Sequence, residues 1–201
     1  MFRPEETHVV PSISVVGYGF CFPYLVDLVV KKKTIGLFRV RYDVLEDNKN
    51  LIFQVEGRFW QLKRKRIMTN TANFPILTMR GKGLAWHDQW TVHEGDSLDS
   101  SKILYTVKQK SHPLHIKTEL EVFLADNIVR DIPDFRVIGC FTSQSFEVYK
   151  GDIIIAEVMD SGSFLLRSRK TFRVRVYPGV DHAFILSLLI TFSEIDTGYH
   201  Y

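Results

Sequence analysis

The sequence predicts a mainly β protein, a closed barrel of about twelve strands around a buried C-terminal hydrophobic helix. Three observations predict this fold. Short segments alternate apolar and polar residues with the period of two that is typical of strands. Clusters of Gly, Asn, Asp and Lys separate these segments, as hairpin turns do. One segment near the C-terminus is instead apolar on every side at helical spacing, so something must enclose it.

Alternation within each segment justifies the strands. Phe38, Val40 and Tyr42 alternate with Arg39 and Arg41, which predicts one face in the core and the other in solvent. About twelve strands are more than an ordinary open sheet contains, and closure into a barrel removes the exposed edges. The expected strands are residues 25–30, 38–42, 53–56, 63–66, 76–79, 89–92, 103–107, 116–123, 135–140, 145–149, 153–158 and 172–176.

The central helix is expected over about residues 181–193. Asp181 can cap it, and the charge of this residue suits the positive end of the helix dipole. Ser187 and Thr191 interrupt the apolar run, but each hydroxyl can bond to a carbonyl one turn earlier and so needs no outside partner. The apolar run is about half as long as a membrane-spanning helix. We therefore expect the helix to fill the barrel.

The C-terminal end of this helix is expected near Phe192. Glu194 and Asp196 are unfavourable at a helix C-terminus, because their negative charges oppose the helix dipole there. We therefore expect both residues to lie in solvent beyond the helix.

A chain of 201 residues without a low-complexity linker or an internal repeat is expected to form one domain. This domain should span residues 23–201, with residues 1–22 as an N-terminal extension packed on it. The apolar stretch 9–30 has the length of a targeting segment, but Pro, Gly and Asp interrupt it. Glu5 and Glu6 also stand where a signal peptide carries positive charge.

The cysteine content indicates a reducing compartment. Cys21 and Cys140 cannot form a disulfide framework, and the sequence has no Asn-X-Ser/Thr glycosylation acceptor. We therefore expect an intracellular, cytoplasmic protein that is not secreted. A peripheral position at the plasma membrane and a nuclear location are the alternatives left open.

Catalytic and metal sites are not indicated. His112 and His115 have a His-x-x-His spacing, but no Cys pair or carboxylate cluster nearby completes tetrahedral zinc ligation. Asp181 and His182 look reactive as a pair, yet capping at a helix start explains the aspartate without catalysis. We therefore expect no enzyme activity, no metal and no cofactor.

Several short motifs together resemble a known plant family. They are Cys21-Phe22-Pro23-Tyr24, Leu28-Val29-Val30 with Lys31-Lys32-Lys33, Phe53-Gln54-Val55-Glu56-Gly57, residues 66–75 leading into Leu77-Thr78-Met79-Arg80, Trp90-Thr91-Val92 with Gly95, and Phe172 through His182. In this order they resemble the LURP-one-related family, which belongs to the tubby C-terminal superfamily together with the phospholipid scramblases. The resemblance covers nearly the whole chain and implies a barrel of about twelve strands around the C-terminal helix.

Two positions depart from what the resemblance implies. Where the family usually has an Asp-x-x-Gly turn, this chain has Asn70-Thr71-Ala72-Asn73, and Asn tolerates the left-handed conformation that Gly supplies. Scramblases carry an acidic calcium loop just before the terminal helix, whereas residues 177–181 offer one carboxylate. Calcium takes about six to eight oxygen ligands, so calcium-driven scrambling is disfavoured.

Positive charge is clustered rather than high overall. The formal net charge of +3 is too small to indicate a general nucleic-acid-binding protein, so nucleic acid is not an expected partner. Basic residues gather at 31–33, 63–66 and 167–170, and acidic residues at 94–99 and 126–134. The surface should therefore carry separated fields of opposite sign.

A candidate site for an anionic headgroup comes from two of the basic clusters. A solvated strand edge that discourages aggregation is the simpler interpretation. The alternative is that these cations collect lipid phosphates, as the resemblance to phosphoinositide-binding tubby-like domains implies. The candidate residues are Lys63, Arg64, Lys65, Arg66, Arg167, Arg169 and Lys170. On a strand, alternation sends Lys63 and Lys65 to one side and Arg64 and Arg66 to the other.

We therefore expect a non-enzymatic binding domain that recognises an anionic phospholipid headgroup, such as a phosphoinositide, at a membrane surface. The alternative is a soluble protein-interaction module that binds an unidentified protein and no lipid. Phospholipid scrambling is the third and least favoured function. A role in plant defence or stress is implied by the family resemblance.

Overall fold

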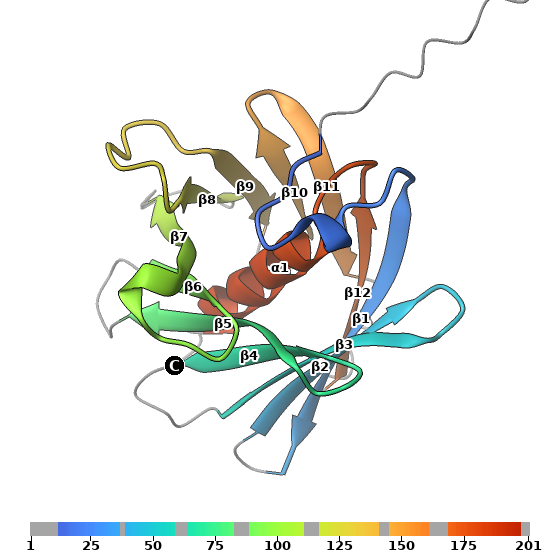
Figure 1. The fold of residues 1–201 in the computed structure, drawn as a ribbon. Coiled ribbons are helices and arrows are strands. Elements are labelled where there is room, and N and C mark those ends of the chain that lie inside the picture. The colour runs from blue at the N-terminus through green and yellow to red at the C-terminus, as the bar shows by residue number, and fades with distance from the viewer. Residues whose placement is uncertain are drawn as a thin grey trace, which may run out of the picture.

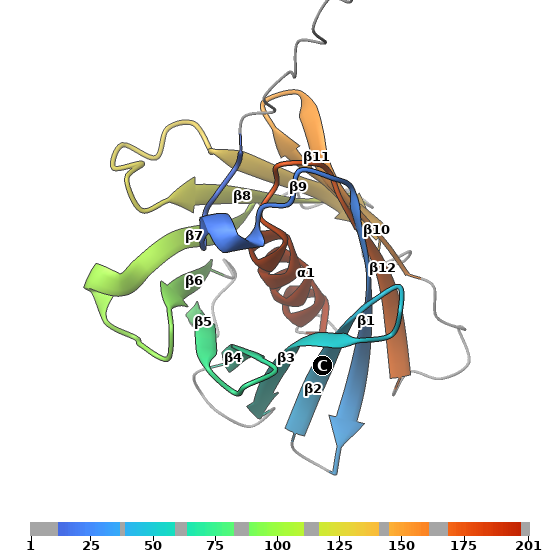
Figure 2. The ribbon, with the colours of Figure 1, turned by 45° about the vertical axis from the view of Figure 1, so that its right-hand side comes forward.

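The computed structural model describes residues 12–36, 39–58, 64–82, 89–110, 117–140, 145–160 and 169–197. Its twelve strands form a closed antiparallel barrel, and one α-helix of the described chain, α1, runs through the middle (Figures 1 and 2). The predicted fold is confirmed. The elements are η1 (Tyr18–Phe20), β1 (Val26–Ile35), β2 (Arg39–Glu46), β3 (Leu51–Arg58), β4 (Lys65–Asn70), β5 (Pro75–Lys82), β6 (Gln89–Glu94), η2 (Ser100–Lys102), β7 (Ile103–Lys110), β8 (Lys117–Leu124), β9 (Phe135–Cys140), β10 (Ser145–Lys150), β11 (Ile153–Asp160), β12 (Arg169–Val176) and α1 (His182–Thr197).

Each strand pairs with the strands before and after it, and β1 pairs with β12 to close the barrel. Because all neighbours are antiparallel, odd-numbered strands begin and even-numbered strands end at the same end of the barrel. Helix α1 also begins there, directly after β12. We call this end the N-terminal mouth and the opposite end, toward which α1 runs, the C-terminal mouth.

The lumen is the hydrophobic core. Alternate strand residues point inward, and the buried set includes Trp90 and Tyr105 from the wall and Phe184 and Leu186 from α1. Helix α1 has no polar stripe because the wall surrounds it on all sides. Within the described chain, no helix is both long enough and apolar enough to cross a membrane.

The two hydroxyls of α1 differ from each other. Ser187 Oγ donates to the carbonyl of Phe184 at 2.6 Å, as predicted, and also contacts the hydroxyl of Tyr105 across the lumen. Thr191 was expected to bond to its own helix in the same way. This prediction is wrong, because its buried hydroxyl has no hydrogen-bond partner within the described part of the chain.

The helix also continues further than the sequence predicts. It runs to Thr197, so that both Glu194 and Asp196 lie within it. Glu194 is not in solvent: its side chain is buried and its carboxylate pairs with Arg66 Nη2 at 2.5 Å. The expectation failed because a cation on β4 compensates the negative charge that the helix end disfavours.

Residues 12–22 cross the N-terminal mouth beside the start of α1 (Figure 1). Asp181 caps the helix as predicted, accepting from the backbone N–H of Phe184 at 3.0 Å through Oδ1. Its Oδ2 accepts three further backbone N–H groups, those of Val15, Val16 and Gly17, at 2.7–3.1 Å. One buried carboxylate therefore caps α1 and holds the N-terminal segment.

The turn between β4 and β5 keeps its shape without glycine. Asn73 adopts the left-handed conformation with φ of 63°. Its backbone N–H donates to the carbonyl of Asn70, which closes the turn. The predicted role of Asn in this turn is confirmed.

Candidate functional site

Cationic side chains gather on the outer wall formed by β12, β1 and β2. Because Val30 and its inward neighbours face the core, Lys31 and Lys33 of β1 point outward. Lys33 is the direct cross-strand partner of Arg41 on β2, and Arg173 of β12 lies opposite Val29, beside Lys31. We call Lys31, Lys33, Arg39, Arg41 and Arg173 the cationic face.

Two carboxylates partly compensate this face. Asp43 accepts from Lys33 Nζ and Arg41 Nε, each at 2.7 Å. Partial burial opposes ionisation of Asp43, but hydrogen bonds from the two cations outweigh it and hold its pKa below the ordinary range. Glu56 on β3 pairs with Arg39 at 3.0 Å and with Arg41 at 3.7 Å.

Two cations of the face form no ion pair within the described chain, although Asp43, which accepts from Lys33 and Arg41, is the cross-strand neighbour of Lys31. Lys31 and Arg173 are exposed and form no ion pair or hydrogen bond through their side chains with any described residue. Their separation is that of diagonal neighbours on paired strands, about 7–8 Å between Cα atoms. They are therefore the groups best placed to bind an external anion.

The residues predicted from the sequence to bind an anionic headgroup do not form one site in the structure. Lys63 and Arg167 lie outside the described residues. Arg169 and Lys170 begin β12, where they are the backbone partners of Lys33 and Lys32. The third basic cluster of the sequence therefore meets the first one on adjacent strands.

The 63–66 cluster is different. Arg64 is half-buried, and Lys65 pairs with Asp96 at 2.6 Å and keeps 26% of its side-chain exposure. Arg66 is 1% exposed and forms the ion pair with Glu194 inside the lumen. Lys65 and Arg66 thus face opposite sides of β4, as predicted, but Arg66 is not part of the surface.

The cationic face as a unit was not among the sequence-based predictions. Lys31 and Lys33 stood in a recognised basic run, and Arg39 and Arg173 in recognised alternating strands. What could not be read from these patterns is the closure between β1 and β12, which brings residues from both ends of the chain together. Strand alternation combined with an assumed closure would have found the face.

Negative charge gathers at the other end of the barrel. The turns and strand ends at the N-terminal mouth carry Glu46, Asp47, Glu94, Asp96, Asp126, Asp131, Asp134 and Asp152. Lys33 and Arg39, by contrast, lie at strand ends near the C-terminal mouth. Lys49, Lys102, Arg130 and Lys150 lie at the N-terminal mouth as well, so the separation of opposite fields stays a prediction.

Comparison with known proteins places this architecture in one family. The model of the LURP-one-related family matches residues 26–193, from the start of β1 into the last turns of α1. Protein LURP-one-related 14 of Arabidopsis thaliana is 40% identical over 183 residues, covering 90% of this chain and 89% of that protein. Protein LURP-one-related 9 of the same plant is 38% identical, covering 89% of this chain and 95% of that protein.

A solved structure has the same fold. The X-ray structure of another Arabidopsis thaliana protein matches with a TM-score of 0.70 and 31% identity, covering 91% of this chain and 98% of that chain. The family model spans all twelve strands and most of α1. The chain therefore belongs to the LURP-one-related family.

Proposed function

We propose that this protein is a non-enzymatic binding module that attaches to anionic phospholipid headgroups, such as phosphoinositides, at an intracellular membrane surface. The supporting observation is the cationic face, where Lys31 and Arg173 form no ion pair with any described residue. Each such cation contributes on the order of 1 kcal/mol near an acidic membrane. The backbone of β12 at Arg169 and Lys170 pairs with the end of β1, next to this face.

Binding is favoured over catalysis by what fills the barrel. Small barrels that hold ligands do so in the lumen, and here α1 occupies it. In the described ranges, His, Cys, Asp and Glu do not gather in groups of three or more that suit a metal ion. The outer wall and the two mouths are therefore the surfaces available for function.

The alternative function, a protein-interaction module, has its own supporting observation. Large apolar side chains at the N-terminal mouth are strongly exposed, among them Ile128 at 87%, Tyr18 at 78%, Ile132 at 77%, Ile153 at 71% and Phe74 at 69%. Exposed apolar groups that gather on one end of a molecule are typical of protein contacts.

We propose a role in plant defence or stress for either function, on the basis of family membership.

Sedimentation with phosphoinositide-containing vesicles tests the lipid proposal. We expect the wild-type protein to bind at about 0.1 M salt and to be released near 0.5 M, because salt screens exposed charges. Replacing both Lys31→Glu and Arg173→Glu should abolish binding. The matched control, Lys102→Glu with Lys150→Glu, makes the same charge change at the N-terminal mouth and should leave binding nearly unchanged.

If the wild-type protein does not sediment with these vesicles even at low salt, the lipid-binding function is excluded and the protein-interaction module is the remaining function. Equal losses in the two double variants would mean that net charge, rather than the cationic face, determines binding.

A further inference from the structure

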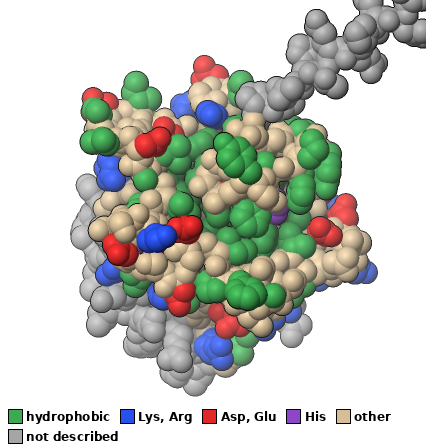
Figure 3. Space-filling view, in the orientation of Figure 1, with side chains coloured by type: hydrophobic (Ala, Val, Ile, Leu, Met, Phe, Trp, Pro, Cys, Tyr) green, Lys and Arg blue, Asp and Glu red, His purple; other side chains and the backbone are tan. Residues whose placement is uncertain are grey.

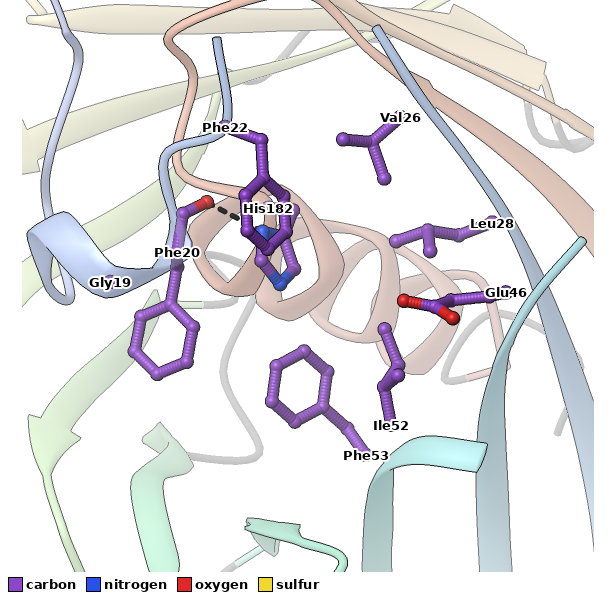
Figure 4. Close-up of a pocket in the computed structure, with 9 residues that line it drawn as sticks. All are labelled: Gly19, Phe20, Phe22, Val26, Leu28, Glu46, Ile52, Phe53 and His182. Atoms are coloured by element: carbon purple, nitrogen blue, oxygen red, sulfur yellow. Dashed lines mark hydrogen bonds between the residues drawn. The ribbon is translucent and has the colours of Figure 1, made fainter. Parts of the chain in front are cut away.

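The N-terminal mouth contains a pocket of about 220 Å³ that is separate from the cationic face. It lies between residues 19–22, the strands β1 to β3 and the first turn of α1 (Figure 4). In Figure 3 apolar side chains gather in the middle of this face, and histidine atoms are visible between them. The side chains that decide its chemistry are Phe20, Phe22, Phe53, Glu46 and His182.

His182 presents an unprotonated nitrogen to this pocket. Its Nδ1 lies 2.5 Å from the carbonyl oxygen of Phe20, which can only accept, so Nδ1 carries the proton. Burial holds the pKa of His182 below its ordinary 6.5, so the imidazole is neutral at pH 7 and Nε2 keeps its lone pair. Figure 4 shows Nε2 on the pocket side, and it has no hydrogen-bond partner among the described residues.

Glu46 supplies a second acceptor. Figure 4 shows its carboxylate turned toward the pocket between Leu28 and Ile52. Oε2 accepts from the side chain of Asn48 at 3.2 Å, whereas Oε1 has no partner in the described part of the chain. Both polar groups that face the pocket therefore accept hydrogen bonds, and one of them carries a negative charge.

Aromatic rings complete the site. Phe22 stacks on His182 with centroids 5.1 Å apart, and the rings of Phe20 and Phe53 lie at 5.6 and 5.5 Å from the imidazole. Aromatic faces attract cations, and a carboxylate beside them adds to this attraction. An anion would be repelled by Glu46, and an apolar molecule without a donor would bury Glu46 without a partner.

We propose that this pocket binds an ammonium group carried on a small apolar body. The ammonium donates to Glu46 Oε1 and His182 Nε2, and the apolar body packs on the phenylalanine rings. Two sources have this chemistry, a free amine and the lysine side chain of a peptide. The volume of the pocket suits either one and is below the 300 Å³ or so typical of larger ligands.

NMR titration of the full chain tests this proposal with probes of equal shape. Phenethylammonium should shift the amide signals of Gly19, Phe20 and Phe53, phenethyl alcohol should bind more weakly, and phenylacetate should not bind. Nα-acetyl-lysine methylamide represents the peptide source, and the tighter of the two amines identifies the source. No shift with either amine at millimolar concentration, or equal binding of the alcohol, overturns the proposal.

Two variants distinguish a direct contact with Glu46 in the pocket from a general attraction to negative charge at the N-terminal mouth. Glu46→Gln should weaken phenethylammonium binding about tenfold, since a hydrogen bond to a charged group is of that order. Asp47→Asn removes the same charge one residue away, at an exposed position that does not line the pocket, and should change binding less than twofold. Equal effects of the two variants would overturn the assignment of Glu46.

Discussion

The buried ion pair between Arg66 and Glu194 belongs to a polar network that holds the end of α1 against the barrel wall. Tyr42 donates to Glu194 Oε1 at 2.8 Å, and Lys32 Nζ donates to Ser193 Oγ at 3.1 Å, so a small polar network joins β1, β2, β4 and α1. A buried ion pair adds little net stability compared with apolar packing, but losing one partner leaves the other charge buried and uncompensated. The network therefore fixes where the end of α1 sits against the wall.

Arg66→Met should reduce the free energy of unfolding by about 3 to 5 kcal/mol, because the Glu194 carboxylate then loses its main partner in a buried site. Lys65→Met is the adjacent control. Its ion pair with Asp96 is partly exposed, so its loss should cost at most about 1 kcal/mol.

Urea denaturation measures the free energy of unfolding of Arg66→Met and Lys65→Met. The double variant Arg66→Met with Glu194→Met should recover part of the loss, since no carboxylate is then left without its arginine. Similar costs for Arg66→Met and Lys65→Met would contradict the assignment of Arg66 to the lumen.

The same pair predicts a pH dependence. Burial alone would raise the pKa of Glu194, but the charges of Arg66 and Lys32 and the hydrogen bond from Tyr42 outweigh it and hold the pKa below the ordinary 4.5. A lowered folded-state pKa stabilises the fold above the unfolded value and loses this contribution as the pH falls below it. The stability of the wild type relative to Glu194→Gln should therefore be greatest near neutral pH and shrink as the pH drops below about 4.5.

Denaturation curves for wild type and Glu194→Gln at about pH 6 and about pH 3 measure this change. Other carboxylates titrate in both proteins, so the difference between the two isolates Glu194. A difference that stays constant over this range would mean that Glu194 titrates normally.

At the scale of the element, α1 depends on its first residue as well as on its apolar surface. Asp181 accepts one hydrogen bond from the helix and three from residues 15–17. An ordinary N-cap contributes about 1 kcal/mol. Asp181 does more, because the same carboxylate fastens the segment that crosses the mouth.

Asp181→Ala should therefore cost about 2 to 4 kcal/mol, since four backbone N–H groups lose their acceptor. Asp99→Ala is the matched control. Asp99 caps the short surface helix η2 through a single bond to Ser101, so its loss should cost about 1 kcal/mol or less.

Thermal melts compare the two cap variants, and hydrogen exchange of the amides of Val15, Val16 and Gly17 provides a second measurement. Exchange at these amides should accelerate in Asp181→Ala and stay unchanged in Asp99→Ala. Equal melting temperatures would show that residues 12–22 do not depend on Asp181.

At the scale of the whole molecule, the acidic groups surround one mouth without converging. Glu94 ends β6, Asp126 and Asp131 lie between β8 and β9, and Asp152 lies between β10 and β11. The described residues form no cluster of three or more potential metal ligands. Millimolar calcium and micromolar zinc should therefore leave the melting temperature unchanged, because neither ion finds its ligand number. A rise of several degrees with either ion would reveal a metal site.

The barrel could be predicted from the sequence because each strand and the helix has its own local residue pattern. The alternation of Phe172, Val174 and Val176 and the all-apolar surface of the helix each specify a local structure, and closure follows from the number of strands. The pairing of Arg66 with Glu194 could not be predicted in this way, because neither local pattern identifies a partner so distant in the chain. The cationic face and the His182 pocket were missed for the same reason, since each joins segments from both ends of the sequence.

Closure between the first and last strands has a consequence for synthesis of the chain. Val26 meets its partner Val176 only after every other strand has been made, and α1 emerges later still. Until then the growing sheet has two open edges and an apolar inner surface with nothing inside it. Productive folding on the ribosome therefore waits for the last residues to be translated, and a stalled or shortened chain leaves an aggregation-prone sheet for chaperones and proteases to remove.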